Sequence, residues 1–217
     1  VENGRIVFVG AYADFSPGRR NIEEIDLGNA AIIPGLVNAH THLEFSHLTK
    51  PLGHPGMAFT DWVRLVVGQR QDSNPQLKRQ SIAAGIRQSF ECGVWAIGEI
   101  ATDPFDDRDY VAAMPESVLS DLPQGSCSIE MCLYLEQLGS DSNRLQEQQT
   151  RLRSHLGGDR SGNAGVSAGA SPHAPYSVAP ALLSQICDAA IATDAGVAMH
   201  VAETKAEIEL LDRGTGE

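Results

Sequence analysis

Short apolar runs alternate with longer stretches of helical spacing along most of the chain, and this alternation is the main structural signal in the sequence. The short apolar runs cover residues 36–39, 94–100, 128–134, 165–170 and 196–201. The stretches with helical spacing cover residues 61–71, 77–92, 142–156, 179–193 and 205–212. Because buried strands that alternate with helices form parallel strand–helix–strand units, the pattern predicts five such units within residues 35–217.

Residues 1–34 precede this alternation and carry a different pattern. The β-rich runs at residues 5–10 and 30–33 are separated by turn residues such as Ser16-Pro17-Gly18, and Pro34-Gly35 closes the segment. Turn residues between short apolar runs are typical of strands in a small sheet. We therefore expect residues 1–34 to form a few strands outside the main domain.

His40 and His42 directly follow the first strand of the predicted alternation. In an extended chain, residues two apart project to the same side, so two imidazoles at this spacing can hold one ion. An isolated pair of this kind is more often structural than ligating. Its position favours ligands, because parallel barrel enzymes assemble their active sites at the C-terminal ends of their strands.

His200 lies near the end of the fifth predicted strand, and Glu203 follows three residues later. This arrangement suits metal-assisted hydrolysis, in which the metal lowers the pKa of a bound water and the carboxylate carries a proton to the leaving group. The alternative is a strand-end histidine beside a glutamate that only caps the next helix.

His173 follows the fourth predicted strand, and Pro172 and Pro175 lie on either side of it. The two prolines restrict the backbone around the histidine, as expected of a rigid active-site loop. We expect His173 to contact a substrate, the alternative being a structural histidine that bonds a carbonyl group.

The charge and composition of the chain indicate which classes of partner and which cellular compartment to expect. The 28 acidic and 16 basic residues give a formal net charge of −12. Because an acidic surface repels phosphate backbones, we expect no nucleic acid partner. No apolar run approaches the ~20 residues needed to cross a bilayer, so we expect no membrane partner. The four cysteines form no Cys-x-x-Cys pair, which favours buried free thiols in a reducing compartment and a cytoplasmic protein.

Three separated motifs in this chain resemble the amidohydrolase superfamily: PGLVNAHTHLE at residues 34–44, SPHAPYS at residues 171–177 and HVAET at residues 200–204. The chain is similar to the cytosine deaminase-like branch, which includes adenosine, S-adenosylhomocysteine and aminodeoxyfutalosine deaminases and the triazine hydrolases. The resemblance implies an α/β fold, an incomplete TIM (β/α)8 barrel of about five β/α units in residues 35–217. It also implies that residues 1–34 are the N-terminal strands of a small flanking β-sandwich domain.

The resemblance assigns roles to the residues described above. His40, His42 and His200 match metal ligands, Glu203 matches the general acid/base, and His173 matches a histidine that contacts the substrate. Binuclear relatives bridge two metals with a modified lysine on the fourth strand, and this chain has no lysine there. We therefore expect one divalent metal ion, zinc first and iron(II) second.

The expected function is that of a metal-dependent hydrolase of non-peptide carbon–nitrogen bonds. Its small-molecule substrate would be a heteroaromatic amine of nucleoside type, which is deaminated. One alternative is a chlorohydrolase of the triazine type. Another is a non-catalytic, truncated metal-binding fragment that pairs its open edge with another chain, as in a homo-oligomer. Because the family's sixth-strand histidine and eighth-strand aspartate have no counterpart here, we expect an N-terminal fragment that lacks turnover alone.

Overall fold

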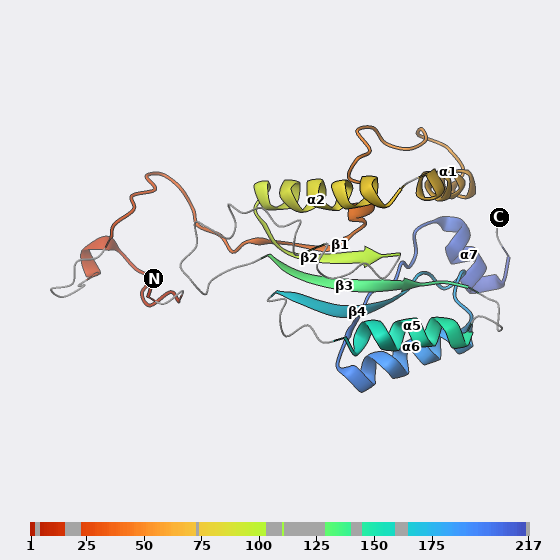
Figure 1. Ribbon diagram of the computed structural model, residues 1–217. Coiled ribbons are helices and arrows are strands. Elements are labelled where there is room, and N and C mark those ends of the chain that lie inside the picture. Colours follow the sequence, from red (N-terminus) through yellow and green to blue (C-terminus); the bar gives the residue numbers. More distant parts are fainter. Residues whose placement is uncertain are drawn as a thin grey trace.

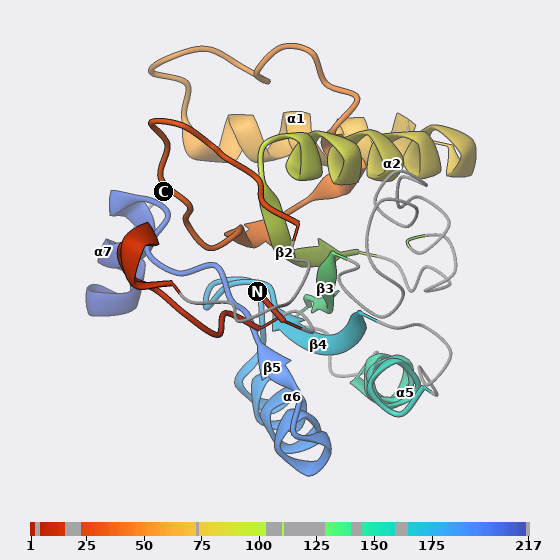
Figure 2. The ribbon, with the colours of Figure 1, turned by 90° about the vertical axis from the view of Figure 1, so that its left-hand side faces the viewer.

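The computed structural model describes residues 1–2, 5–15, 23–72, 74–102, 110, 129–139, 145–158 and 165–215. Its centre is one parallel sheet with the strand order β1-β2-β3-β4-β5. Figures 1 and 2 show the helices on the outside of this curved sheet, with α1 and α2 beyond β1 and β2, and α5 and α6 beyond β3 and β4. The arrangement is a half-barrel with helices, which confirms the predicted partial TIM barrel.

The elements follow the predicted alternation closely. The strands are β1 (Leu36–Thr41), β2 (Val94–Ala101), β3 (Glu130–Gln137), β4 (Val166–Pro172) and β5 (Gly196–Val197). The α-helices are α1 (Phe59–Asp72), α2 (Pro75–Glu91), α5 (Leu145–Leu156), α6 (Pro180–Thr193) and α7 (Lys205–Arg213), and the 3-10 turns are η1 (Tyr12–Asp14) and η2 (Leu43–Phe45). None of the described helices is both long and apolar enough to span a membrane.

Local sequence signals set the helix boundaries. Asn74 accepts a hydrogen bond from the Leu77 N–H at 2.8 Å, and Pro75 occupies the first turn of α2, where its missing N–H costs nothing. Gly93, at a φ of 81°, then turns the chain directly into β2. These signals bring α2 back antiparallel to the strands and against the outer face of the sheet.

The apolar core lies between the sheet and the helices, in two clusters. One cluster joins α2 to β2 and β3, and includes Ile82, Ile86, Ile97, Met131 and Leu133. The other joins α5 and α6 to β3 and β4, and includes Leu135, Leu152, Ala170, Leu182 and Ile186. Both clusters cover the outer face of the sheet. Because the strands are parallel, their carboxyl ends lie at one common edge.

The Tyr134 ring lies against glycines of the neighbouring strands β2 and β4. A Cβ atom at Gly169 would collide with the Tyr134 ring, and one at Gly98 would collide with the Ala39 carbonyl and approach the same ring. The two glycines therefore allow a large ring to occupy the space beneath the carboxyl edge.

The fifth strand is shorter than the sequence predicts. The predicted run covers residues 196–201, whereas β5 ends at Val197. Beyond that residue the Ala198 N–H donates to the Ala170 carbonyl at 3.0 Å, and the His200 N–H donates to the His173 carbonyl at 2.8 Å. The chain thus continues along the edge of β4 through single hydrogen bonds instead of a regular ladder.

The segment before Pro34 differs from the predicted sheet. Its described residues form one bridge, between Glu2 and Arg5, and the turn η1, but no strand. Their large apolar side chains are exposed, including Val9 at 85% and Ile32 at 82%, and Figure 1 shows the segment leading away from the sheet. Short strands need a third strand or a helix to cover their apolar face. The assignment of residues 1–34 to a β-sandwich stays a prediction.

Candidate metal centre and active site

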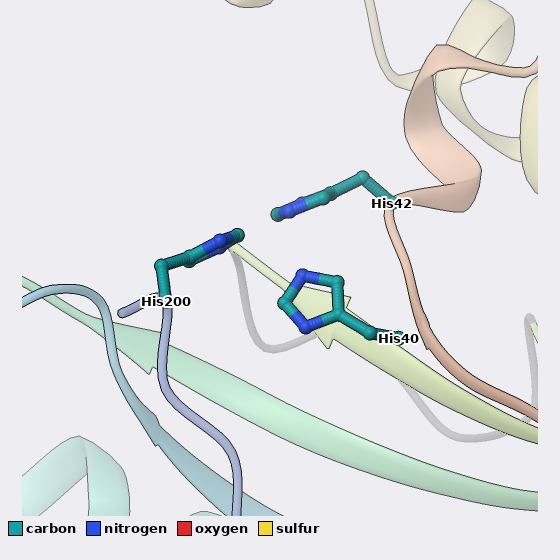
Figure 3. A group of neighbouring side chains, drawn as sticks. All are labelled: His40, His42 and His200. Carbon is teal, nitrogen blue, oxygen red and sulfur yellow. The ribbon is translucent and has the colours of Figure 1, made fainter. Parts of the chain in front are cut away.

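Three histidines from opposite edges of the sheet meet at its carboxyl end. One ligand nitrogen from each of His40, His42 and His200 lies within 4.8 Å of the others. The ring centroids of His40 and His200 are 4.5 Å apart, and both other pairs are at 5.4 Å. Figure 3 shows the three rings turned toward a common point between β1 and the segment after β5.

The β1 side of this cluster is held by the sheet ladder and by a buried carboxylate. His40 lies within β1, and His42 immediately precedes η2. The Leu43 N–H, next along the chain, donates to Glu99 Oε2 on β2 at 2.9 Å. Burial raises the pKa of Glu99 well above its usual value, although the Leu43 N–H acts in the opposite direction. This contact ties the backbone after His42 to the neighbouring strand.

The environment suits neutral imidazoles that bind a metal. Burial is the largest cause that lowers the pKa of His42 to about 3, and it also lowers the pKa of His40. Among the described residues, the buried His42 Nδ1 and His200 Nε2 have no hydrogen-bond partner. Because a metal ligand must offer a deprotonated nitrogen, these unpaired atoms fit a cation at the centre of the cluster. Three imidazoles are a donor set that zinc accepts.

Glu203 lies beside this cluster, as the sequence predicts. Its Oε1 is 3.6 Å from His200 Nδ1, and its Oε2 accepts a hydrogen bond from the Tyr176 hydroxyl at 2.9 Å. Burial, and then the Glu203 carboxylate, raise the pKa of the Tyr176 phenol, so Tyr176 stays a donor. Tyr176 therefore holds one oxygen of the Glu203 carboxylate, and the other oxygen lies near the His200 ring.

His173 occupies the same cavity, with its ring centroid 5.0 Å from that of His200. The Ser177 hydroxyl donates to the Ala174 carbonyl at 3.2 Å and lies 2.6 Å from His173 Nδ1. The short contact with Ser177 fixes the orientation of the His173 ring at this end of the cavity. Burial is the main cause that lowers the pKa of His173 to about 4, which keeps the ring neutral.

Two residues of the site were not identified from the sequence, Glu136 and Arg70. The Glu136 side chain is 1% exposed at the end of β3, with Oε2 3.3 Å from Arg70 Nη1 and Oε1 3.9 Å from His200 Nε2. Arg70 also binds Glu44 at 2.9 Å. Glu136, His173 and His200 form a second group that could hold a cation, and it shares His200 with the first. The strand-end rule applied to the histidines would also have found Glu136.

A cavity of about 820 Å³ opens over these groups. Its polar end carries His42, Glu136, His173, His200 and Glu203, and its remaining walls are mostly apolar. Phe59 and Trp62 of α1 line it with their rings stacked at 5.9 Å. An apolar, aromatic cavity with a few convergent polar groups is the usual form of a small-molecule site.

Comparison with known proteins places the chain in a family. The profile of the amidohydrolase family matches residues 31–217, and the chain belongs to that family. A 5-methylthioadenosine/S-adenosylhomocysteine deaminase from Moorella thermoacetica is 24% identical over 209 residues, which cover 96% of this chain and 46% of that protein. An aminodeoxyfutalosine deaminase from Nitratiruptor is 27% identical over 190 residues, which cover 87% and 43%. The chain thus spans about half the length of the curated relatives it matches.

Solved structures share the fold. A Helicobacter pylori aminofutalosine deaminase in complex with methylthio-coformycin superposes with a TM-score of 0.64 at 21% identity, over 85% of this chain and 41% of that chain. An atrazine chlorohydrolase from Arthrobacter aurescens complexed with zinc superposes with a TM-score of 0.62 at 13% identity, over 84% and 44%. At these identities the likeness establishes the partial amidohydrolase barrel.

Proposed function

We propose that the whole protein is a metal-dependent hydrolase of non-peptide carbon–nitrogen bonds, which deaminates a heteroaromatic amine of nucleoside type. The observation that carries this proposal is the meeting of His40, His42 and His200 with Glu203 at the polar end of an apolar cavity. The relatives named above as deaminases support the choice of reaction.

The donor set indicates which group completes the site. His40, His42 and His200 would hold one divalent ion, zinc as the first expectation and iron(II) as the second. When bound, such an ion activates water for attack at neutral pH. We infer that Glu203 would take one proton from that water and deliver it to the substrate ring nitrogen. It would then take the second proton, from the hydroxyl added to the ring, and deliver it to the amine, which leaves as ammonia. Tyr176 holds one Glu203 oxygen, so the other oxygen faces the reaction.

The rest of the cavity suits a planar substrate with a polar substituent. The apolar walls that include Phe59 and Trp62 suit the face of a heteroaromatic ring. His173 lines the cavity with a ring that burial keeps neutral, and it would form a hydrogen bond with a polar group of the substituent. These two features support a substrate of nucleoside type.

A chlorohydrolase of the triazine type is the second candidate, favoured by the shared fold with the atrazine chlorohydrolase. The two reactions use the same metal and carboxylate but release different products. Purified, zinc-loaded whole protein should be assayed for ammonia from 5-methylthioadenosine and adenosine, and for chloride from atrazine. We expect ammonia from a nucleoside; release of chloride alone would move the assignment to the second candidate.

The same assay tests the prediction about the fragment. We expect the 217-residue chain to bind metal weakly and to show no turnover, since a fourth protein ligand is expected from the rest of the barrel. Full activity of the purified chain would contradict this prediction, and absence of activity in the whole protein would favour a non-catalytic metal-binding protein.

We also propose a cytoplasmic location. The described cysteines Cys92, Cys132 and Cys187 are free thiols, which supports a reducing compartment. A homo-oligomer stays a prediction, which light scattering of the purified protein would test.

A further inference from the structure

Glu207, in the first turn of α7, is a buried carboxylate outside the set of metal-binding and proton-carrying residues. Only 4% of the residue is exposed. Its Oε1 accepts a hydrogen bond from the Ala202 N–H at 3.0 Å, and its Oε2 accepts one from the Glu203 N–H at 2.6 Å. Both carboxylate oxygens are therefore used by the backbone of the turn between His200 and α7.

This turn holds an unfavourable backbone conformation. Ala202 has a φ of +60°, in the left-handed region that residues with a Cβ atom seldom adopt. Its N–H is one of the two that Glu207 accepts. Charge-assisted hydrogen bonds to a buried carboxylate are stronger than neutral ones, so Glu207 stabilises the turn in this conformation.

The bonds of Glu207 differ from ordinary helix capping. The side chain of Thr204 caps α7 by accepting the Glu207 N–H at 3.1 Å. In a capping box the glutamate would reach back to the N–H of the capping residue itself. Glu207 instead bonds the two residues before Thr204, and one of them is Glu203. The Glu207 carboxylate thus stabilises the turn before α7, whereas the Thr204 side chain stabilises the first turn of α7.

We propose that Glu207 is a positioning residue that sets Glu203 against His200, an inference that rests on the proposed function. Ala202 lies between these two residues, and its φ determines where the Glu203 backbone leaves the turn. With Glu207 in place, Glu203 Oε1 is 3.6 Å from His200 Nδ1. Without it, Ala202 relaxes to negative φ and the carboxylate moves away from the metal-binding histidines.

The experiment compares Glu207→Gln with Thr204→Ala in the zinc-loaded whole protein, with 5-methylthioadenosine as substrate. A glutamine accepts only one of the two N–H groups and turns its own NH2 toward the other. We expect kcat to fall about 10- to 100-fold, as for other residues that orient active-site groups, with KM within about threefold. Thr204→Ala should lower Tm but leave kcat within about twofold.

Rescue by a second substitution separates positioning from general destabilisation. Glycine adopts positive φ without strain, so adding Ala202→Gly to Glu207→Gln should recover a large part of kcat. Glu207→Asp, which keeps the charge but is too short for both bonds, provides a milder variant if Glu207→Gln does not fold. An unchanged kcat in Glu207→Gln, with a Tm lowered as in Thr204→Ala, would overturn the proposal.

A readout without turnover distinguishes failure of this inference from failure of the proposed function. Cobalt(II) titrated into the metal-free whole protein reports on His200 through its visible absorption. We expect Glu207→Gln to weaken cobalt binding about 10-fold or to shift the absorption, with Thr204→Ala unchanged. If the wild-type protein deaminates no nucleoside, the proposed function fails. An unaltered cobalt titration in Glu207→Gln then overturns the positioning role as well, and an altered one supports it.

Discussion

The two arms that carry the metal-binding histidines reach the same point by different means. The β1 arm, residues 36–45, is a six-residue strand that pairs with β2 at both its ends, although its register shifts between Asn38 and Thr41, around His40. The β5 arm, residues 196–207, has a two-residue strand and then leaves the ladder. In the β1 arm the pairing of Thr41 with Glu99 resumes between the two histidines, whereas in the β5 arm side chains must hold the backbone.

A buried glutamate stabilises the backbone of each arm, but the two glutamates differ in the number of N–H groups that they accept. Glu99 on β2 accepts one N–H, from Leu43, beyond the end of a strand that already has its own hydrogen bonds. Glu207 accepts two N–H groups in a turn without a ladder and with one residue at positive φ. The β1 arm has sheet pairing on both sides of its histidines, so we expect it to tolerate the loss of its glutamate better than the β5 arm, and four further predictions test this contrast.

The largest expected effect lies in the β5 arm, on the residue that Glu207 orients. Glu203→Gln removes the proton carrier but leaves the three histidines in place. We expect kcat of the whole protein to fall by about 10²- to 10⁴-fold, the range typical of general acid–base groups, with metal content unchanged. Glu209→Gln, a substitution of an exposed glutamate of α7, should behave as wild type. Full activity of Glu203→Gln would contradict the proton-transfer role proposed for Glu203.

Removal of one histidine from each arm comes next. His42→Ala and His200→Ala each delete one of three nitrogen ligands, so we expect the zinc affinity to fall by more than the roughly 100-fold seen when supporting residues are lost. A chelator competition measures this affinity. His54→Ala is the matched control, because His54 is exposed and bonds only the Pro55 carbonyl among the described contacts. Zinc affinity equal to wild type in either variant would contradict the assignment of the substituted histidine as a metal ligand.

The buried glutamate of the β1 arm predicts a pH dependence. The pKa of Glu99 is raised in the folded state by burial, so folded protein keeps a proton that unfolded protein releases. The free energy of unfolding should therefore fall as pH rises above about 4.5, by at most about 1.4 kcal/mol per pH unit. Glu99→Gln keeps an acceptor for Leu43 and should flatten this dependence. Urea unfolding at several pH values measures it, with the exposed Glu130→Gln as control; identical slopes in both variants would contradict the prediction.

The smallest expected effect concerns the helix caps beside the two arms. Asn74 caps α2, which packs behind the β1 arm, and Thr204 caps α7 at the end of the β5 arm. Asn74→Ala and Thr204→Ala should each lower the free energy of unfolding by about 1 kcal/mol. Neither should change kcat, since the described hydrogen bonds of the two cap side chains go to the Leu77 and Glu207 N–H groups and not to the histidines or the Glu203 side chain. A large loss of kcat in only one of the two variants would show that the position of the histidines in that arm depends on the stability of its helix.

The contrast between the arms also explains which parts of the site were predictable. His40 and His42 follow from the two-residue period of a strand and its carboxyl end, and His200, Glu203 and His173 follow from the same rule and the family resemblance. The structure places His42, His173, His200 and Glu203 in the lining of one cavity, and His40 beside His42 and His200. The length of β5 was predicted wrongly, because the apolar run continues to residue 201 whereas the ladder stops at Val197.

The sequence by itself determined the alternation of strands and helices and the edge at which the histidines gather, since both depend on local periodicity and on the common direction of parallel strands. The expectation of a partial barrel came from the resemblance to the family. Only the tertiary structure decided that Arg70 joins the site, because its contact with Glu136 links α1 to β3 across 65 intervening positions of the chain. It also decided that Glu207 holds the turn before its own helix. The orientation of a buried carboxylate depends on which unpaired N–H groups the fold brings to it, and no spacing in the sequence records that.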